Sequence, residues 1–225
     1  MIRKLEWDSA FFGIEIGVYE SGEINYSNQY DLMITKSHLP GAFFLQGYEM
    51  AMQEEKRIYE KELCHIPSIA SEVQFFSLSG LEARDLYPLA FEAGKFSRFR
   101  LDPHFGEDAF RRLYRRWVEA SINGTFADAV FVLVQKEALR GFVTVKIKEK
   151  IGYIGLIASD PCHQHQGVGS TLLVYAEQWA MMAGAQRMKI PTQAMNRGAC
   201  VFYEKKGYLL AERSYISHYW RLKKT

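Results

Sequence analysis

The residues whose types and spacing most suggest chemistry lie between positions 157 and 173. The apolar stretch Ile157-Ala158-Ser159 is followed by a polar turn with two glycines, and the turn opens an amphipathic segment. Glycine lets a ligand approach the backbone closely, and the first N–H groups of a helix are unpaired and lie at its positive end. A turn of this kind is suited to bind a pyrophosphate. It is not a P-loop, because no Gly-Lys-Ser/Thr follows, and the incomplete GxGxxG argues against a dinucleotide site.

The elements that would hold this turn follow a regular pattern from residue 73 onward. Strands are predicted at 73–78, 129–135, 141–148, 152–159 and 187–192, and one strand or two at 208–222. Helices are predicted at 81–93, capped by Ser79 and kinked at Pro88, and at 107–122, 167–183 and 196–206. The alternation of strands and helices after residue 150 predicts an α/β core.

The first 72 residues are less regular. Tyr30–Thr35 reads as a strand, whereas 47–63 combines a charged run typical of helix with the alternation of a strand. Gly47-Tyr48 is followed by a tyrosine at the same offset as Gly207-Tyr208, and this weak echo favours strands after Gly47. We therefore expect a small α/β unit at 1–72, built as a reduced copy of the domain at 73–225, with a linker at 65–68.

Composition limits the functions that are open to the chain. Among 225 residues, 48% are hydrophobic and the net charge is 28 minus 26, or +2, which argues against disorder and against bulk binding to nucleic acid or anionic membranes. The three cysteines form no CxxC pair, which favours free thiols in a reducing compartment. Apolar runs are far shorter than a membrane span, and no signal peptide is evident, so we expect a cytoplasmic protein without membrane insertion.

The glycine turn resembles the acetyl-CoA motif of the GNAT family of N-acetyltransferases. Gln164-x-x-Gly167-x-Gly169 follows a strand, Asn196 stands seven residues before Tyr203, and Gly207-Tyr208 comes next. The resemblance covers about 73–225 and implies an α/β fold with a mixed, mostly antiparallel central sheet flanked by helices. It also implies acetyl-CoA as cosubstrate and no metal. The residues that it implies for cofactor binding are Ile157, Ala158, Ser159, Gln164, His165, Gln166, Gly167, Val168, Gly169, Ser170, Asn196 and Tyr203.

Further segments resemble one branch of that family, the dTDP-fucosamine acetyltransferases of enterobacterial common antigen synthesis. These segments are 7–13, 96–100, 117–126, 192–193 and 219–221. The resemblance implies acetylation of a nucleotide-linked amino sugar, dTDP-4-amino-4,6-dideoxygalactose. Two alternatives stay open: acetylation of another amine on a small metabolite or protein, and a CoA-binding module without catalysis. A homodimer is expected from the family alone.

The chemistry of this reaction assigns roles to a few side chains. A neutral amine attacks the thioester directly, the oxyanion is stabilised, and the departing thiolate is protonated. The resemblance makes Tyr203 the general acid, with a core tyrosine as the alternative, and the N–H groups near 157–159 the oxyanion donors. Asn196 is expected to bind the pantetheine arm, to cap the last helix, or to do both. No general base is identified; His104, His165 and a water relay remain open.

Six arginines fall between positions 98 and 116. Those within the predicted helix, at 111, 112, 115 and 116, lie mostly off its apolar stripe and are expected to be solvated. Arg98 and Arg100 precede Asp102-Pro103 in a predicted loop, where they are expected to bind the diphosphate of the acceptor. Cys162, His163 and His165 have no second ligand pair nearby, which disfavours zinc, and Cys200 is expected to be a buried apolar residue.

Overall fold

The computed structural model of the protein describes residues 2–19, 29–41, 43–64, 72–163 and 166–222. Within these residues one mixed sheet has the order β1-β2-β3-β10-β4-β9-β8-β7-β6-β5. Neighbours are antiparallel except β2 with β3 and β8 with β9. The strands are β1 (Ile2–Lys4), β2 (Ile16–Tyr19), β3 (Leu32–Ser37), β4 (Tyr48–Glu62), β5 (Val73–Phe75), β6 (Ala129–Gln135), β7 (Ala138–Lys148), β8 (Ile151–Ser159), β9 (Arg187–Gln193) and β10 (Leu209–Arg221).

Helices cover both faces of the sheet. Alternate side chains of β6 show the two cores: Phe131 packs in the core that includes α5, and Val130 packs in the core that includes α2 and α4. This is the mixed α/β fold that the sequence predicted. The helices are α1 (Glu6–Phe12), α2 (Ala83–Ala93), α3 (Arg98–Leu101), α4 (Gly106–Ile122), α5 (Val168–Met182) and α6 (Arg197–Lys205).

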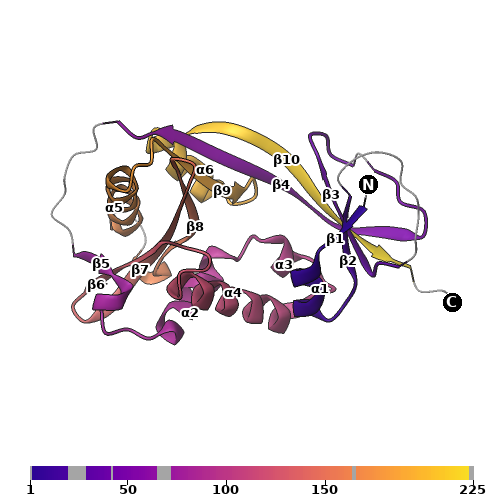
Figure 1. Ribbon diagram of the computed structural model, residues 1–225, viewed down its shortest axis with the longest axis horizontal. Helices are drawn as coiled ribbons and strands as arrows, with labels where there is room; N and C mark the ends of the chain where they lie inside the picture. The colour runs from indigo at the N-terminus through magenta and orange to yellow at the C-terminus, as the bar shows by residue number, and fades with distance from the viewer. Residues whose placement is uncertain (1, 20–28, 42, 65–71, 164–165, 223–225) are drawn as a thin grey trace.

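The two longest strands come from opposite ends of the chain and pair with each other. In Figure 1, β4 and β10 run side by side as a curved ribbon, with α1 to α4 along the opposite side of the molecule. The strand predicted after Gly47 is thus confirmed, and 209–221 forms one strand. Leu210 pairs with Tyr59, and Tyr219 pairs with Met50. Met50 and Leu210 are 160 positions apart, as are Tyr59 and Tyr219, so a shift of 160 positions turns one pair into the other. The echo in the sequence therefore coincides with a local two-fold relation.

Several predicted boundaries were wrong for local reasons. β5 ends at Phe75 and a short 3-10 turn, Phe76–Leu78, follows it. Ser79 does not cap α2; Glu82 does, in a capping box in which Glu82 N donates to Asp85 Oδ2 at 2.8 Å.

The hairpins joining β6 to β7 and β7 to β8 are tighter than predicted. Lys136 and Glu137 have φ of 50° and 61°, and Glu149 and Lys150 have φ of 52° and 60°. Two left-handed residues in succession make the two-residue turn whose twist suits a hairpin, although neither pair contains glycine. β7 and β8 consequently begin at 138 and 151 rather than at 141 and 152.

The first strands of the chain belong to the same sheet as the rest. β4 lies between β9 and β10, which are the last two strands of the chain. The predicted linker at 65–68 lies outside the described residues, and the division at residue 72 stays a prediction. Among the described helices, none is both long and apolar enough to cross a membrane.

Candidate active site

The centre of the sheet opens where β8 and β9 separate. The two parallel strands pair only from Ile151 to Tyr153 on β8 and from Arg187 to Lys189 on β9. β8 continues to Ser159, and β9 continues to Gln193 beside β4. The second half of β8 therefore has an edge without a strand partner among the described residues, which leaves main-chain groups available to a bound ligand.

A bulge in β8 accompanies this separation. Gly155 and Leu156 together face the single residue Thr144 of β7, because Ile154 pairs with Val145 and Ile157 pairs with Val143. Leu156 N donates to Thr144 Oγ1 at 2.9 Å, and a Cβ on Gly155 would lie 2.9 Å from the same oxygen. A bulge bends the strand that carries it, so this bulge turns the end of β8 away from the direction in which it would continue to pair with β9.

The glycine turn lies at the amino end of α5. Gly167 is the N-cap residue with φ of 86°, a left-handed conformation that glycine adopts without strain, and no described side chain caps the helix. Helix N-termini without a side-chain cap suit anions, so this turn keeps the property for which the sequence singled it out; its role in binding stays a prediction. Gln166 is described and exposed, whereas Gln164 and His165 lie outside the described residues.

One cavity of about 1130 Å³ joins this turn to the other predicted groups. The cavity lining includes residues of β4, α3, α4, β8, the start of α5, β9 and α6. The predicted residues that line the cavity are Arg98, Ile157, Ala158, Ser159, Gly167, Val168, Gly169, Ser170, Asn196 and Tyr203. Most of the residues singled out by the sequence are therefore brought together; Gln166 and Arg100 are described but are not among the lining residues.

Asn196 is the N-cap residue of α6, and Tyr203 lies within that helix. Asn196 Oδ1 accepts a hydrogen bond from Ala199 N at 3.3 Å, so this side chain caps α6 and also lines the cavity. Tyr203 is buried against Tyr59 and Tyr208. Burial, with a smaller effect of Cys200, raises the pKa of the Tyr203 phenol. The phenol is consequently protonated at neutral pH.

The two arginines predicted to bind the acceptor have different surroundings. Arg98 Nη1 lies 3.2 Å from Glu54 Oε1, and the Glu54 residue is only 2% exposed. The Arg98 guanidinium stacks over the Phe99 ring. Arg100 pairs with Glu107 at 3.6 Å and lies over the Phe110 ring. The arginines of α4 are exposed, as predicted.

The structure gives the surroundings of two of the histidines and of Cys200, which is buried as predicted; His104 stays an open candidate for the base, and His165 lies outside the described residues. His104 Nδ1 lies 3.1 Å from Asp102 Oδ1, and its ring stacks on Trp220. His163 lies 2.7 Å from Asp160 Oδ2. Cys200 is buried, and its thiol donates to Gln193 O. Among the described residues no group of three potential ligands could hold a metal ion.

The sequence did not single out Glu54 and Lys56, which line the cavity from β4. They occur in the charged run Glu54-Glu55-Lys56-Arg57, which by itself is typical of a solvated surface. The alternation along β4 separates the four: Glu54 and Lys56 face the cavity, whereas Arg57 Nε binds Glu55 at 2.8 Å. The alternation was present in the sequence, but the buried face could not be assigned without the partners of β4.

Comparisons with known proteins agree with this geometry. A family model described as the acetyltransferase (GNAT) family matches residues 86–208. A search among curated proteins gave no match.

Solved structures share the fold at low sequence identity. A conserved protein of unknown function from Staphylococcus epidermidis aligns with a TM-score of 0.59 and 15% identity over 92% of this chain and 85% of its own. A GCN5-related N-acetyltransferase from Sphaerobacter thermophilus aligns at 0.55 and 14%, over 86% and 61%. The PaiA N-acetyltransferase from Thermoplasma acidophilum, solved with coenzyme A, aligns at 0.52 and 19%, over 65% and 97%.

Proposed function

Because the chain belongs to the GNAT family of acetyltransferases, we propose that it transfers the acetyl group of acetyl-CoA to the amine of a nucleotide-linked amino sugar. Acetyl-CoA-dependent N-acetyltransfer is the activity of the family. The amino sugar, with dTDP-4-amino-4,6-dideoxygalactose as the specific candidate, is the part that we propose. Its support comes from the residues that line the cavity.

The observation that carries the proposal is that one cavity is lined by two chemically different sets of residues. The first set is the glycine turn, the open edge of β8 and Tyr203. The second set, which we call the acceptor end, has the aromatic side chains of Trp117 and Tyr114, the cation Lys56 and the ion pair of Arg98 with Glu54. Apolar and aromatic walls with a few polar groups hold uncharged rings, and cationic groups beside them hold phosphates. A sugar attached to a diphosphate matches both properties.

The residues of the chain divide the work of the transfer. The first turn of α5 would hold the pyrophosphate of acetyl-CoA, and the free edge of β8 would bind its pantetheine arm. When bound, acetyl-CoA supplies a thioester carbonyl that a neutral amine attacks. N–H groups near 157–159 would stabilise the charge that develops on the carbonyl oxygen. Tyr203 would donate its phenolic proton to the leaving sulfur and then regain a proton from the acylated nitrogen.

The test is CoA release, followed with a thiol reagent, over a panel of acceptors. The panel contains dTDP-linked and UDP-linked 4-amino sugars, the same sugars without nucleotide, a polyamine and a lysine peptide. We expect the nucleotide-linked sugars to give the highest kcat/KM. Faster acetylation of the polyamine or the peptide would contradict the proposed acceptor class while leaving the acetyltransferase activity in place.

A further inference from the structure

The described residues contain four buried side-chain atoms without a hydrogen-bond partner, and they belong to neighbouring groups. They are Glu54 Oε2, Ser97 Oγ, Arg98 Nε and His218 Nε2. Glu54, Ser97 and Arg98 line the acceptor end of the cavity. Buried polar atoms are nearly always paired, and each one left unpaired costs ~1–3 kcal/mol. Two of these atoms, Glu54 Oε2 and Arg98 Nε, belong to one ion pair whose residues both line the cavity, which indicates a ligand that pairs with both.

The ion pair between Glu54 and Arg98 defines what that ligand must offer. Arg98 Nη1 donates to Glu54 Oε1, so the two charges compensate each other inside the protein. What remains is one acceptor, Oε2, and one donor, Nε. A hydroxyl group can donate to the first and accept from the second. An ammonium group only donates, and a phosphate only accepts and is repelled by the carboxylate.

The Arg98 side chain is held by its ion pair with Glu54 and by aromatic contact. The Arg98 guanidinium stacks at 4.5 Å over Phe99, whose own ring contacts Trp117 at 6.0 Å. The Tyr114 ring fills the space beside Gly94, where a Cβ would lie 2.3 Å from its Cζ. A subsite whose polar atoms are held rigidly selects ligands more sharply than a mobile one, because little ordering is needed on binding.

We propose that Glu54 and Arg98 bind a ring hydroxyl of the acceptor sugar and thereby determine specificity for the sugar. The inference rests on the proposed function and deepens it. It assigns Arg98 to the sugar ring rather than to the diphosphate. Lys56, two residues after Glu54 on β4, then remains as a cavity-lining cation for the diphosphate. It also gives the amino-terminal part of the chain a role in acceptor recognition, because Glu54 lies on β4.

The test combines variants with acceptor analogues. The acceptors are a dTDP-linked 4-amino-4,6-dideoxyhexose and its analogues lacking one ring hydroxyl each. The wild-type enzyme is expected to lose about 10- to 100-fold in kcat/KM with one of the analogues, as for a hydrogen bond to a charged group. Glu54→Gln is expected to lose a similar factor with the full sugar and almost nothing more with that analogue, because both changes remove the same contact.

A second variant guards against loss of folding. Arg98→Lys keeps a cation for Glu54 but removes the Nε donor, and it should show the same non-additivity. The matched control is Glu55→Gln, next on β4, whose side chain pairs with Arg57 and Arg213. In all variants the KM for acetyl-CoA should stay within about twofold, which reports an intact fold.

The outcomes separate the two proposals. If the wild-type enzyme acetylates the nucleotide sugar and the losses from Glu54→Gln and from the analogues simply add, the subsite is wrong and the proposed function stands. Unchanged kcat/KM in Glu54→Gln would likewise overturn the subsite alone. If no nucleotide sugar is acetylated while another amine is, the proposed function fails and the subsite fails with it.

Discussion

His218 Nδ1 lies 2.7 Å from Asp102 Oδ2, and both side chains are completely buried. The same carboxylate oxygen accepts a hydrogen bond from Trp220 Nε1 at 2.9 Å. Asp102 follows α3 and His218 lies on β10, so this contact fastens the Arg98 segment to the sheet. Burial raises the pKa of Asp102, but hydrogen bonds from His218 and Trp220 outweigh it and hold the pKa at about 2.

Asp102→Asn is expected to lower the free energy of unfolding at pH 7 by ~2 kcal/mol, the equivalent of a pKa moved from 3.8 to about 2. Because the pKa is lower in the folded state, this stabilisation is present above the unfolded pKa of 3.8 and disappears as the pH falls toward 2. Burial also lowers the pKa of His218, which adds acid sensitivity below pH 6.5. Urea unfolding at several pH values measures the difference, with the exposed Asp108→Asn as control.

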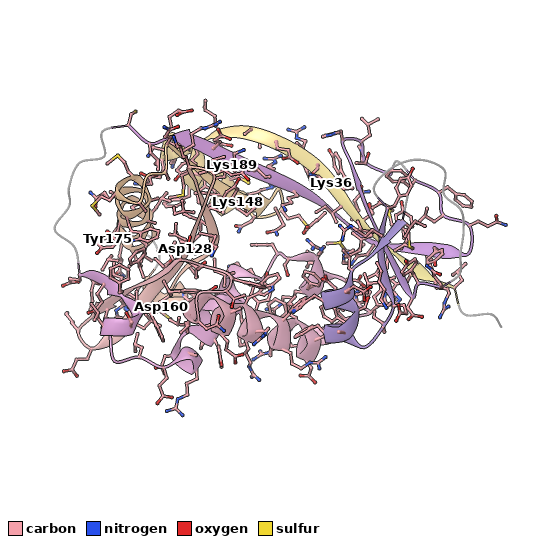
Figure 2. The ribbon with its side chains drawn as sticks, viewed as in Figure 1. Lys36, Asp128, Lys148, Asp160, Tyr175 and Lys189 are labelled. Atoms are coloured by element: carbon pink, nitrogen blue, oxygen red, sulfur yellow. The ribbon has the colours of Figure 1, made fainter. Side chains whose placement is uncertain are left out.

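Tyr203→Phe is expected to lower kcat by about 10²-fold, the loss typical of removing a general acid, with little change in acetyl-CoA affinity. The ring contacts with Tyr59 and Tyr208 do not need the hydroxyl, so the fold should persist. Tyr175→Phe on α5 (Figure 2) removes a phenol that does not line the cavity and is the control. Equal turnover in the two variants would remove Tyr203 from the acid role.

Gly141→Ala is expected to weaken both stability and acetyl-CoA binding. The added Cβ would lie 2.7 Å from Ala158 O and 2.9 Å from Val168 Cγ1, so it pushes on β8, whose Ala158 lines the cavity, and on the start of α5. Overpacking of this kind costs ~1–3 kcal/mol. Thermal unfolding and the KM for acetyl-CoA report the two effects. Gly198→Ala, whose Cβ would meet no described atom within 4 Å, should not lower the melting temperature.

Thr144→Val tests the bulge. It removes the oxygen that accepts from Leu156 N and leaves that N–H buried without a partner, at a cost of ~1–3 kcal/mol. We expect the KM for acetyl-CoA to rise more than the KM for the acceptor, because Leu156 leads into the edge proposed to bind the pantetheine arm. Thr144→Ser, which keeps the oxygen, should retain most of the affinity; equal losses in both variants would argue against the hydrogen bond.

Arg100→Gln is expected to leave the KM for the nucleotide sugar within about twofold, since Arg100 pairs with Glu107 outside the cavity. The sequence predicted equal roles for Arg98 and Arg100. Steady-state kinetics on the two single variants decide between these expectations. A rise in KM with Arg100→Gln as large as that with Arg98→Gln would restore the interpretation from the sequence.

Features with local causes could be predicted from the sequence. The amphipathic pattern of α4 and the glycine turn at Gly167 depend on residues within one or two turns of each other, and the structure has both. The partners of β4 could not be predicted, because its neighbours on both sides lie more than 100 residues later in the chain. The face on which Glu54 lies depended on those partners, so Glu54 and Lys56 were missed as residues that line the cavity.

The position of β4 between β9 and β10 also constrains how the chain folds during synthesis. β4 leaves the ribosome early, yet both of its sheet edges pair only with residues from 187 onward. Until then this fifteen-residue segment has neither of its sheet partners, and unpaired segments of this kind are prone to aggregation. Its charged run Glu54-Glu55-Lys56-Arg57 opposes such pairing, so residues that serve the finished cavity also protect the unfinished chain.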